Sequence, residues 1–199
     1  SEEKLLKNSI KQGIFFRKEL NEYVKGCNAI ASCLGHNMSF QGIFGKPRKL
    51  VTDATKRLCS AINEGEPKST VKYILMNTVG NRNRDLPEKI SFSEKCVIWL
   101  LRLLVPPHID NEEAADFLRT KIGQNDNTIK WVVVRPSSLI DEEDVSEYKT
   151  HSSPTRSAIF NDGKVSRVNV AAFMNKLITD QNLWEKWKGQ MPVIYNKEK

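Results

Sequence analysis

The sequence of 199 residues lacks the marks of several large protein classes. No run reaches the ~18 consecutive apolar residues of a membrane span, and the longest apolar stretch, 96–105, is broken by Arg102. The first residues, SEEKLLK, hold no apolar signal-peptide core. Repeats and low-complexity tracts are absent, and composition is that of a globular chain. We expect one cytoplasmic domain over 1–199, ordered at about 14–195 with a tail at 196–199.

Cysteine is scarce, and its spacing argues against a metal site. No two cysteines form a C-x-x-C pair, and the three histidines form no H-x₃-H pattern, so we expect no bound metal. Scattered cysteines in a chain of this length are typical of reduced, buried thiols in the cytosol. The four are Cys27, Cys33, Cys59 and Cys96.

No long stretch of the sequence is dominated by charge of one sign. The net charge of +7 combines a basic cluster at 46–57 with an acidic cluster at 141–147. Nucleic-acid binding requires basic residues gathered on one face and usually a recognisable module. Neither is present, so nucleic acid is a weak third hypothesis that rests on the 46–57 cluster alone.

Three short apolar segments predict buried strands: 28–34, 71–77 and 130–135. Their centres are continuously apolar or small, which is typical of parallel strands covered on both faces. Apolar residues at helical spacing between them predict an amphipathic helix over 48–63. Ser91 and Glu94 form a capping box for a helix to about Leu104, and Asp110 is expected to cap the next helix. A further helix is predicted over 168–177.

This order of strands and long helical crossovers predicts an α/β fold with a mostly parallel sheet and helices on both faces. Ligands of such sheets bind outside the carboxyl ends of the strands. The loops expected there are 34–37, 77–81 and 135–139, and all are small, polar or glycine-containing. Near the end of the chain, Trp184 and Trp187 are expected to pack a helix on the body, with a dimer surface as the alternative.

Four motifs on these elements, in order, resemble the short-chain dehydrogenase/reductase superfamily. Leu-Gly at 34–35 is similar to its fourth-strand turn, and Asn-Thr-Val-Gly at 77–80 to its S-S-x-G turn. Val-Arg-Pro-Ser-Ser-Leu at 134–139 resembles V-R-P-x-x-L, and 166–171 resembles I-S-R-x-D-V-A with Asn169 in place of the Asp. Together they resemble the atypical, NmrA-like NAD(P)H-binding branch over about residues 14–195.

The resemblance implies a Rossmann-like domain that binds NADP or NAD and transfers hydride to a small carbonyl, quinone or flavin-type substrate. Thr78 would hydrogen-bond the substrate and His108 would act as acid or base, although a turn hydroxyl and a surface histidine are the plain alternatives. Arg135 either contacts the cofactor, pairs with an acid or reaches outward from the strand end. The cofactor-binding positions implied are Leu34, Gly35, His36, Asn77, Thr78, Val79, Arg135, Pro136, Ser137 and Leu139.

The sequence departs from the family at its start. The family opens with a strand, a glycine-rich turn that cradles the pyrophosphate, and a helix. No such turn is found here, and Leu20 to Gly26 falls where the third helix would lie. We therefore expect a Rossmann-like fold that is N-terminally incomplete by roughly fifty residues, as judged from the length of a βαβ unit. Segment 9–16 is a candidate replacement edge strand.

A second departure concerns catalysis, because the helix that should carry Tyr-x-x-x-Lys has no tyrosine. Tyr195 and Lys199 match the spacing, but they lie at the chain terminus and we treat the match as chance. Two hypotheses stay open: an NAD(P)H-dependent oxidoreductase, or an inactive Rossmann scaffold that acts as a redox sensor or protein-interaction module. The substrate, the choice between NAD and NADP, and pairing into a homodimer are also open.

Overall fold

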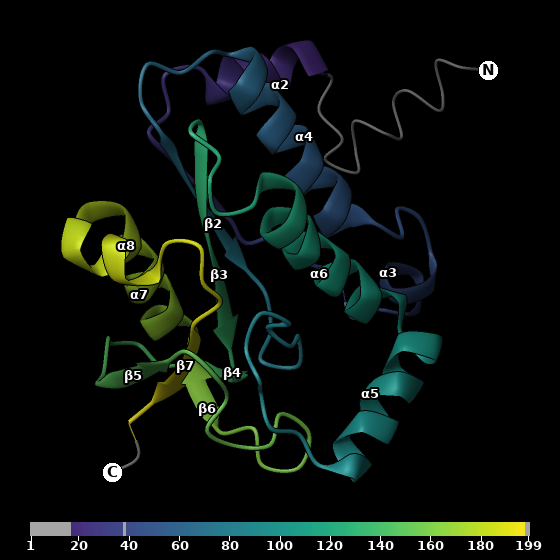
Figure 1. Cartoon of the computed structure of the whole chain (residues 1–199). Helices are drawn as coiled ribbons and strands as arrows, with labels where there is room; N and C mark the ends of the chain where they lie inside the picture. The colour runs from purple at the N-terminus through teal and green to yellow at the C-terminus, as the bar shows by residue number, and fades with distance from the viewer. Residues whose placement is uncertain (1–16, 38, 198–199) are drawn as a thin grey trace.

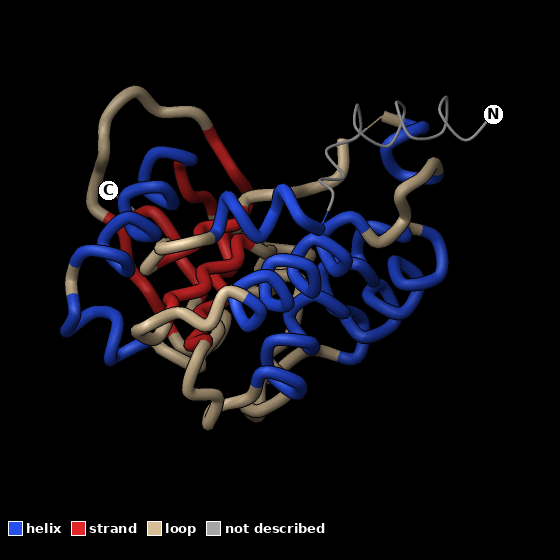
Figure 2. Tube along the Cα trace, turned by 90° about the horizontal axis from the view of Figure 1, so that it is seen from above, coloured by secondary structure: helices blue, strands red, loops and turns tan. Residues whose placement is uncertain are grey.

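The computed structural model describes residues 17–37 and 39–197, which form a sheet with helices on both faces (Figure 1, Figure 2). The five-stranded sheet has the order β1-β2-β3-β7-β5, in which only β5 runs antiparallel to its neighbour. A separate parallel pair, β4 and β6, follows the carboxyl end of β3. The strands are β1 (Ala29–Ser32), β2 (Val71–Met76), β3 (Ile129–Pro136), β4 (Ser138–Ile140), β5 (Tyr148–His151), β6 (Lys164–Ser166) and β7 (Val193–Asn196).

Helices connect the parallel strands, as long crossovers require. Helices α4, α6 and η1 pack on one face of the sheet, and α7 and α8 pack on the other (Figure 1). No helix of the described residues is long and apolar enough to cross a membrane. The helices are α2 (Arg17–Val24), α3 (Phe40–Phe44), α4 (Leu50–Glu64), α5 (Phe92–Leu104), α6 (Pro106–Phe117), the π-helical η1 (Leu118–Ile122), α7 (Arg167–Thr179) and α8 (Gln181–Trp187).

The core forms two clusters because successive strand residues point to opposite faces. Tyr73 and Leu75 of β2 pack with α4, α6 and η1 on one face. Ile74 of the same strand packs with α7 and α8 on the other face, where Trp184 and Trp187 are buried. The tryptophans therefore hold α8 on the body, as predicted, and are not available as a dimer surface.

The predicted α/β fold is confirmed, and all three predicted strands are present within a residue or two of their expected bounds. The capping box is also confirmed: the Ser91 hydroxyl accepts a hydrogen bond from the Glu94 N–H, and the Glu94 carboxylate accepts one from the Ser91 N–H. The helix expected over Leu20 to Gly26 is α2. Segment 9–16 lies outside the described residues, and β7 extends to Asn196, the first residue of the expected tail.

Two expectations were wrong. Asp110 does not cap its own helix, because α6 already begins at Pro106; its carboxylate instead accepts hydrogen bonds from the N–H groups of Val51 and Thr52 at the start of α4. The four free cysteines are not uniformly buried either. Only Cys59 is buried, whereas Cys33 and Cys96 are exposed. Cys33 follows the short edge strand β1, so the apolar pattern around it does not place it in the core.

Candidate functional site

The register of the sheet brings the three predicted loops to one edge. Ser32, the last residue of β1, stands opposite Leu75, and the end of β2 stands opposite Val134. The loop after β2 then continues along β3, because the Val79 N–H donates to the Pro136 carbonyl at 2.9 Å. Residues 33–37, 77–81 and 136–139 therefore share the carboxyl edge of the sheet, as parallel strands require.

The loop after β2 is fixed to α6 by two asparagines. The buried Asn77 amide donates to the Asn111 carbonyl at 2.9 Å, and its oxygen accepts from the Thr78 N–H at 2.9 Å. The Asn81 amide donates to the same Asn111 carbonyl at 3.2 Å. These bonds use the Asn77 side chain within the protein and present Thr78 half-exposed at the surface of the loop.

His108, the second predicted catalytic residue, lies beside this loop. It belongs to the first turn of α6, and its side chain is mostly buried. Its Cε1 and the Thr78 hydroxyl oxygen each lie 3.8 Å from the point where a Cβ on Gly80 would stand. Both side chains thus flank Gly80, and the fold brings together two residues that are 30 positions apart in the printed sequence.

Glu112, one turn further along α6, joins His108 to a group of arginines. Its carboxylate lies 3.5 Å from His108 Nε2 and accepts two hydrogen bonds of 2.8 Å from Arg102. Arg84 Nη2 is 3.6 Å away. Burial alone would raise the pKa of Glu112, but the neighbouring His108 ring and the Arg102 guanidinium together lower it to about 2. The carboxylate is therefore held ionised next to His108.

This lowered pKa predicts how stability changes in acid. The folded pKa of Glu112 lies below its usual 4.5, so its contribution to stability is present above about pH 4.5 and is lost as pH falls towards 2. We expect the free energy of unfolding of Glu112→Gln to fall less steeply than that of the wild type over this interval, as measured by urea denaturation. Glu143→Gln, which removes an exposed carboxylate, is the control. Equal slopes for wild type and Glu112→Gln would contradict the expectation.

His36 is held inside the protein rather than at the open edge. Its Nε2 lies 2.7 Å from the Asp110 carboxylate and its Nδ1 lies 3.2 Å from the Gly42 carbonyl. Because Asp110 also caps α4, the ring braces α3, α4 and α6. The two residues before His36 face the open edge instead. Leu34 is 45% exposed, and a Cβ built on Gly35 would meet no atom within 4 Å.

Arg135, at the end of β3, is fully buried and fully paired. Its guanidinium makes two hydrogen bonds with the buried Glu88 carboxylate, at 2.7 and 3.2 Å. Its other bonds go to the carbonyls of Met191, Asn81 and Ser152, at 2.7, 2.9 and 3.1 Å. The side chain therefore joins the loop after β2 to the segments next to β5 and β7. Of the alternatives left open by the sequence, it pairs with an acid, Glu88, which the sequence reasoning had not identified.

The residues that follow Arg135 turn towards the open edge. The Ser137 hydroxyl is buried and has no hydrogen-bond partner among residues 17–37 and 39–197. Leu139 is partly exposed on β4, and the Ser138 hydroxyl bonds the Asp162 carboxylate. A buried hydroxyl without a partner is unusual, so Ser137 has hydrogen-bonding capacity to offer a ligand.

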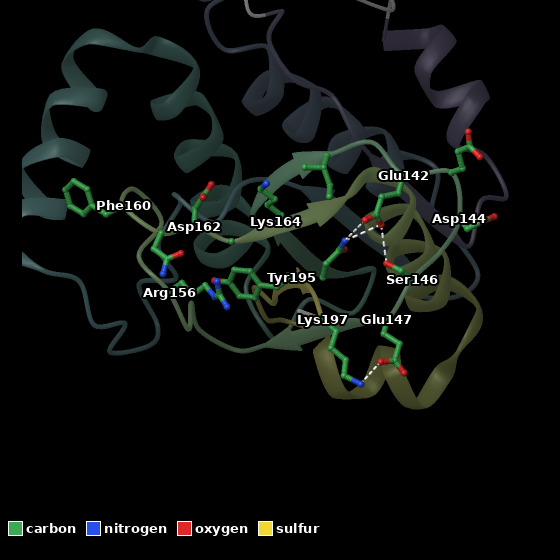
Figure 3. Close-up of a pocket in the computed structure, with 15 residues that line it drawn as sticks. Glu142, Asp144, Ser146, Glu147, Arg156, Phe160, Asp162, Lys164, Tyr195 and Lys197 are labelled. Atoms are coloured by element: carbon green, nitrogen blue, oxygen red, sulfur yellow. Dashed lines mark hydrogen bonds and ion pairs between the residues drawn. The ribbon is translucent and has the colours of Figure 1, made fainter. Parts of the chain in front are cut away.

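A wide groove of about 1450 Å³, which the sequence reasoning missed, opens beyond β4 and β6. Glu142 and Ser146 lie on one side, Arg156 and Phe160 on the other, and Tyr195 between them (Figure 3). Burial raises the pKa of the Tyr195 hydroxyl. The acidic run at 141–147 is the one sequence signal of this groove, and by itself it indicates only a charge cluster.

Asn169 supports one wall of this groove and explains its departure from the family motif. The fully buried amide donates to the Asn196 side-chain oxygen at 2.7 Å and to the Ser146 hydroxyl at 2.9 Å, and its oxygen accepts from the Ser146 N–H at 2.9 Å. An ionised aspartate could accept the last bond but could not donate the first two.

Comparisons with known proteins identify the family of this chain. A family model described as NAD(P)H-binding matches residues 11–181, so the chain belongs to the NAD(P)H-binding family. This confirms the predicted resemblance to atypical, NmrA-like short-chain dehydrogenases/reductases. No curated protein sequence matches the chain significantly.

Solved structures share the fold at low sequence identity. The anaerobilin reductase ChuY from Escherichia coli O157:H7 has a TM-score of 0.60 and 16% identity, over 92% of this chain and 72% of that one. The oxidoreductase ylbE from Lactococcus lactis has a TM-score of 0.59 and 14% identity, over 92% and 68%. A wide-type short-chain dehydrogenase/reductase from Veillonella parvula, solved in complex with NADP, has a TM-score of 0.58 and 13% identity, over 90% and 68%.

Proposed function

We propose that this protein is an NAD(P)H-dependent oxidoreductase that binds its dinucleotide across the carboxyl ends of β1, β2 and β3. The observation that carries the proposal is the carboxyl edge of the sheet, which the loops after β1, β2 and β3 share. The side chains of Thr78 and His108 lie at this edge, and both are suited to carbonyl chemistry. Membership of the NAD(P)H-binding family and the NADP bound to the Veillonella parvula protein support it.

The residues at this edge fit a nucleotide in part. Gly35 faces open space and Leu34 is exposed, so a planar ring can approach the backbone closely after β1. The Ser137 hydroxyl offers a free hydrogen-bonding group after β3. In 17–37 and 39–197, however, no strand leads through a glycine-rich turn into a helix, so these residues supply no such cradle for the pyrophosphate.

Each remaining residue has a proposed task. Bound NADH or NADPH would supply the hydride. The Thr78 hydroxyl orients the carbonyl, quinone or flavin-type group by hydrogen bonding, and the His108 imidazole donates the proton that accompanies reduction. Asn77 and Val79 hold the loop after β2 in place, and His36 joins α3 to α4 through Asp110. Arg135 positions the loop after β2 and the segment after β5 through its buried hydrogen bonds. The free, partly exposed thiols suit the reducing cytoplasm.

Calorimetric titration of the 199-residue chain with NADPH and with NADH tests the proposal. We expect micromolar binding of at least one of the two, and a Gly35→Trp variant that fills the open space after β1 should weaken it about tenfold or more. Gly65→Trp, at the carboxyl end of α4, is the control: it introduces the same side chain away from the site and should leave dinucleotide binding unchanged. A cooperative thermal melt with no dinucleotide binding would overturn the proposal.

A scaffold without catalysis is the second candidate. Two absences among the described residues favour it: no Tyr-x-x-x-Lys pair on the helices between β2 and β3, and no glycine-rich turn between a strand and a helix. Such a protein would bind dinucleotide as a redox sensor, or would bind only a partner protein. Oxidation of NADPH or NADH by quinone, flavin or aldehyde substrates above the rate of a Thr78→Val variant would eliminate this candidate.

A further inference from the structure

Helix α5 has the composition of a buried helix but lies on the surface. Its sequence, FSEKCVIWLLRLL, is apolar around most of its circumference. Helices of this kind are normally enclosed by protein or lipid. Here only Glu94 and Ile98 are buried, and α5 projects from the body beyond the end of α6 (Figure 1).

The outward face of α5 is a continuous apolar surface. Phe92 is 81% exposed, Trp99 62% and Leu103 61%, and they are spaced at seven and four residues, which places them on one side of the helix. Leu100 and Leu104 widen this side. At 1.5 Å per residue the helix is about 20 Å long, too short to cross a bilayer.

Both ends of α5 are fastened to the protein, so the face is presented in a fixed position. The capping box with Ser91 closes its first turn, and the Ser157 hydroxyl donates to the Glu94 carboxylate at 2.6 Å. Arg102, in the last turn, makes its two hydrogen bonds to Glu112 of α6. A rigid, preformed face favours specific docking, because little ordering entropy is lost on binding.

We infer that this apolar face, made of Phe92, Trp99, Leu100, Leu103 and Leu104, is a homodimer interface in which two copies of α5 pack antiparallel. At ~150–250 Å² per aromatic side chain, the exposed parts of its two rings present roughly 200–350 Å². The three leucines enlarge the face towards the ~800 Å² per partner of a standard interface.

The charges on α5 fit this antiparallel pairing. Lys95 is the one charged residue on the outward side of the helix, and it lies in the first turn and a half. A two-fold axis near Trp99 sets Lys95 against the carboxyl end of the partner's α5, which is the negative end of the helix dipole. The positive charge of Arg102 in that last turn is already paired with Glu112. Parallel pairing would instead set the two lysines against each other. Self-complementarity of one face is what a two-fold dimer requires.

Sedimentation of the full chain across a concentration series tests the inference. We expect the wild type to approach twice its 22.7 kDa mass and Leu103→Glu to raise the dimer dissociation constant about 30-fold or more. The matched control is Val145→Glu, which introduces the same charge at an aliphatic residue of similar exposure, 56%, away from α5; it should dimerise like the wild type. Thermal melts establish that both variants are folded.

Two results would overturn the inference. One is a wild-type protein that stays monomeric at every concentration, including a monomer that binds phosphatidylcholine–phosphatidylserine vesicles through α5. The other is a dimer that Leu103→Glu leaves intact, which would place the interface elsewhere. Neither result depends on dinucleotide binding, so the test stands apart from the proposed function.

Discussion

Replacing Glu88 by glutamine should lower the free energy of unfolding by about 3–5 kcal/mol, because it leaves a charged guanidinium buried without its carboxylate. Arg135 and Glu88 are almost completely inaccessible to solvent, and their two hydrogen bonds are 2.7 and 3.2 Å long. With total stabilities of about 5–15 kcal/mol for domains of this kind, such a loss is a large fraction of the whole. Urea denaturation followed by tryptophan fluorescence measures it.

The exposed pair of Arg167 and Asp141 is the matched control. Its side chains are largely in water, so Asp141→Asn should change the free energy of unfolding by no more than about 1 kcal/mol. The double variant Arg135→Met with Glu88→Leu should recover much of the stability lost in Glu88→Gln, since no buried charge remains. A loss in Glu88→Gln no larger than that in Asp141→Asn would show that the buried pair does not hold the two loops together.

The elements that could be predicted from the sequence are those whose signal is local. Strands β2 and β3 have continuously apolar centres, α4 carries helical periodicity, and α5 begins with a capping box. The strands β4, β5 and β6 carry no such signal. They are three or four residues long and contain few apolar residues, so neither length nor alternation distinguishes them from loops. β7 lies between Pro192 and a lysine-rich end, and its last residue, Asn196, is the first residue of the expected tail.

In the site, too, only the features with a local signal could be predicted from the sequence. The loops could be placed at one edge because parallel strands end on one side of a sheet. The pairings that fix those loops could not be predicted, since each joins residues far apart in the chain. His36 and Asp110 are separated by 74 positions and Arg135 and Glu88 by 47. One signal was present: an arginine inside an apolar strand needs a buried carboxylate, and only its identity was unknown.

His108→Ala should lower kcat about 100-fold or more, the usual contribution of a general acid or base, if the imidazole donates the proton in reduction. His108 and Thr78 flank Gly80 at the carboxyl edge of the sheet, where the substrate is proposed to lie. Thr78→Val should act mainly on substrate orientation, and so raise KM as well as lower kcat. Because both act on one reacting group, the double variant should lose less than the product of the single losses.

Controls separate this role from a structural one. His151→Ala removes the histidine of β5, which packs near Tyr195 and away from Gly80, and should leave kcat unchanged. Thr78→Ser keeps the hydroxyl and should restore most of the activity lost in Thr78→Val. A proton donor must be protonated to act, so the fall in rate on the basic side of the pH–rate profile should disappear in His108→Ala and persist in His151→Ala. A His108→Ala enzyme with an unaltered profile would move the proton donor to another residue of the edge, or to bulk water, while leaving dinucleotide binding intact.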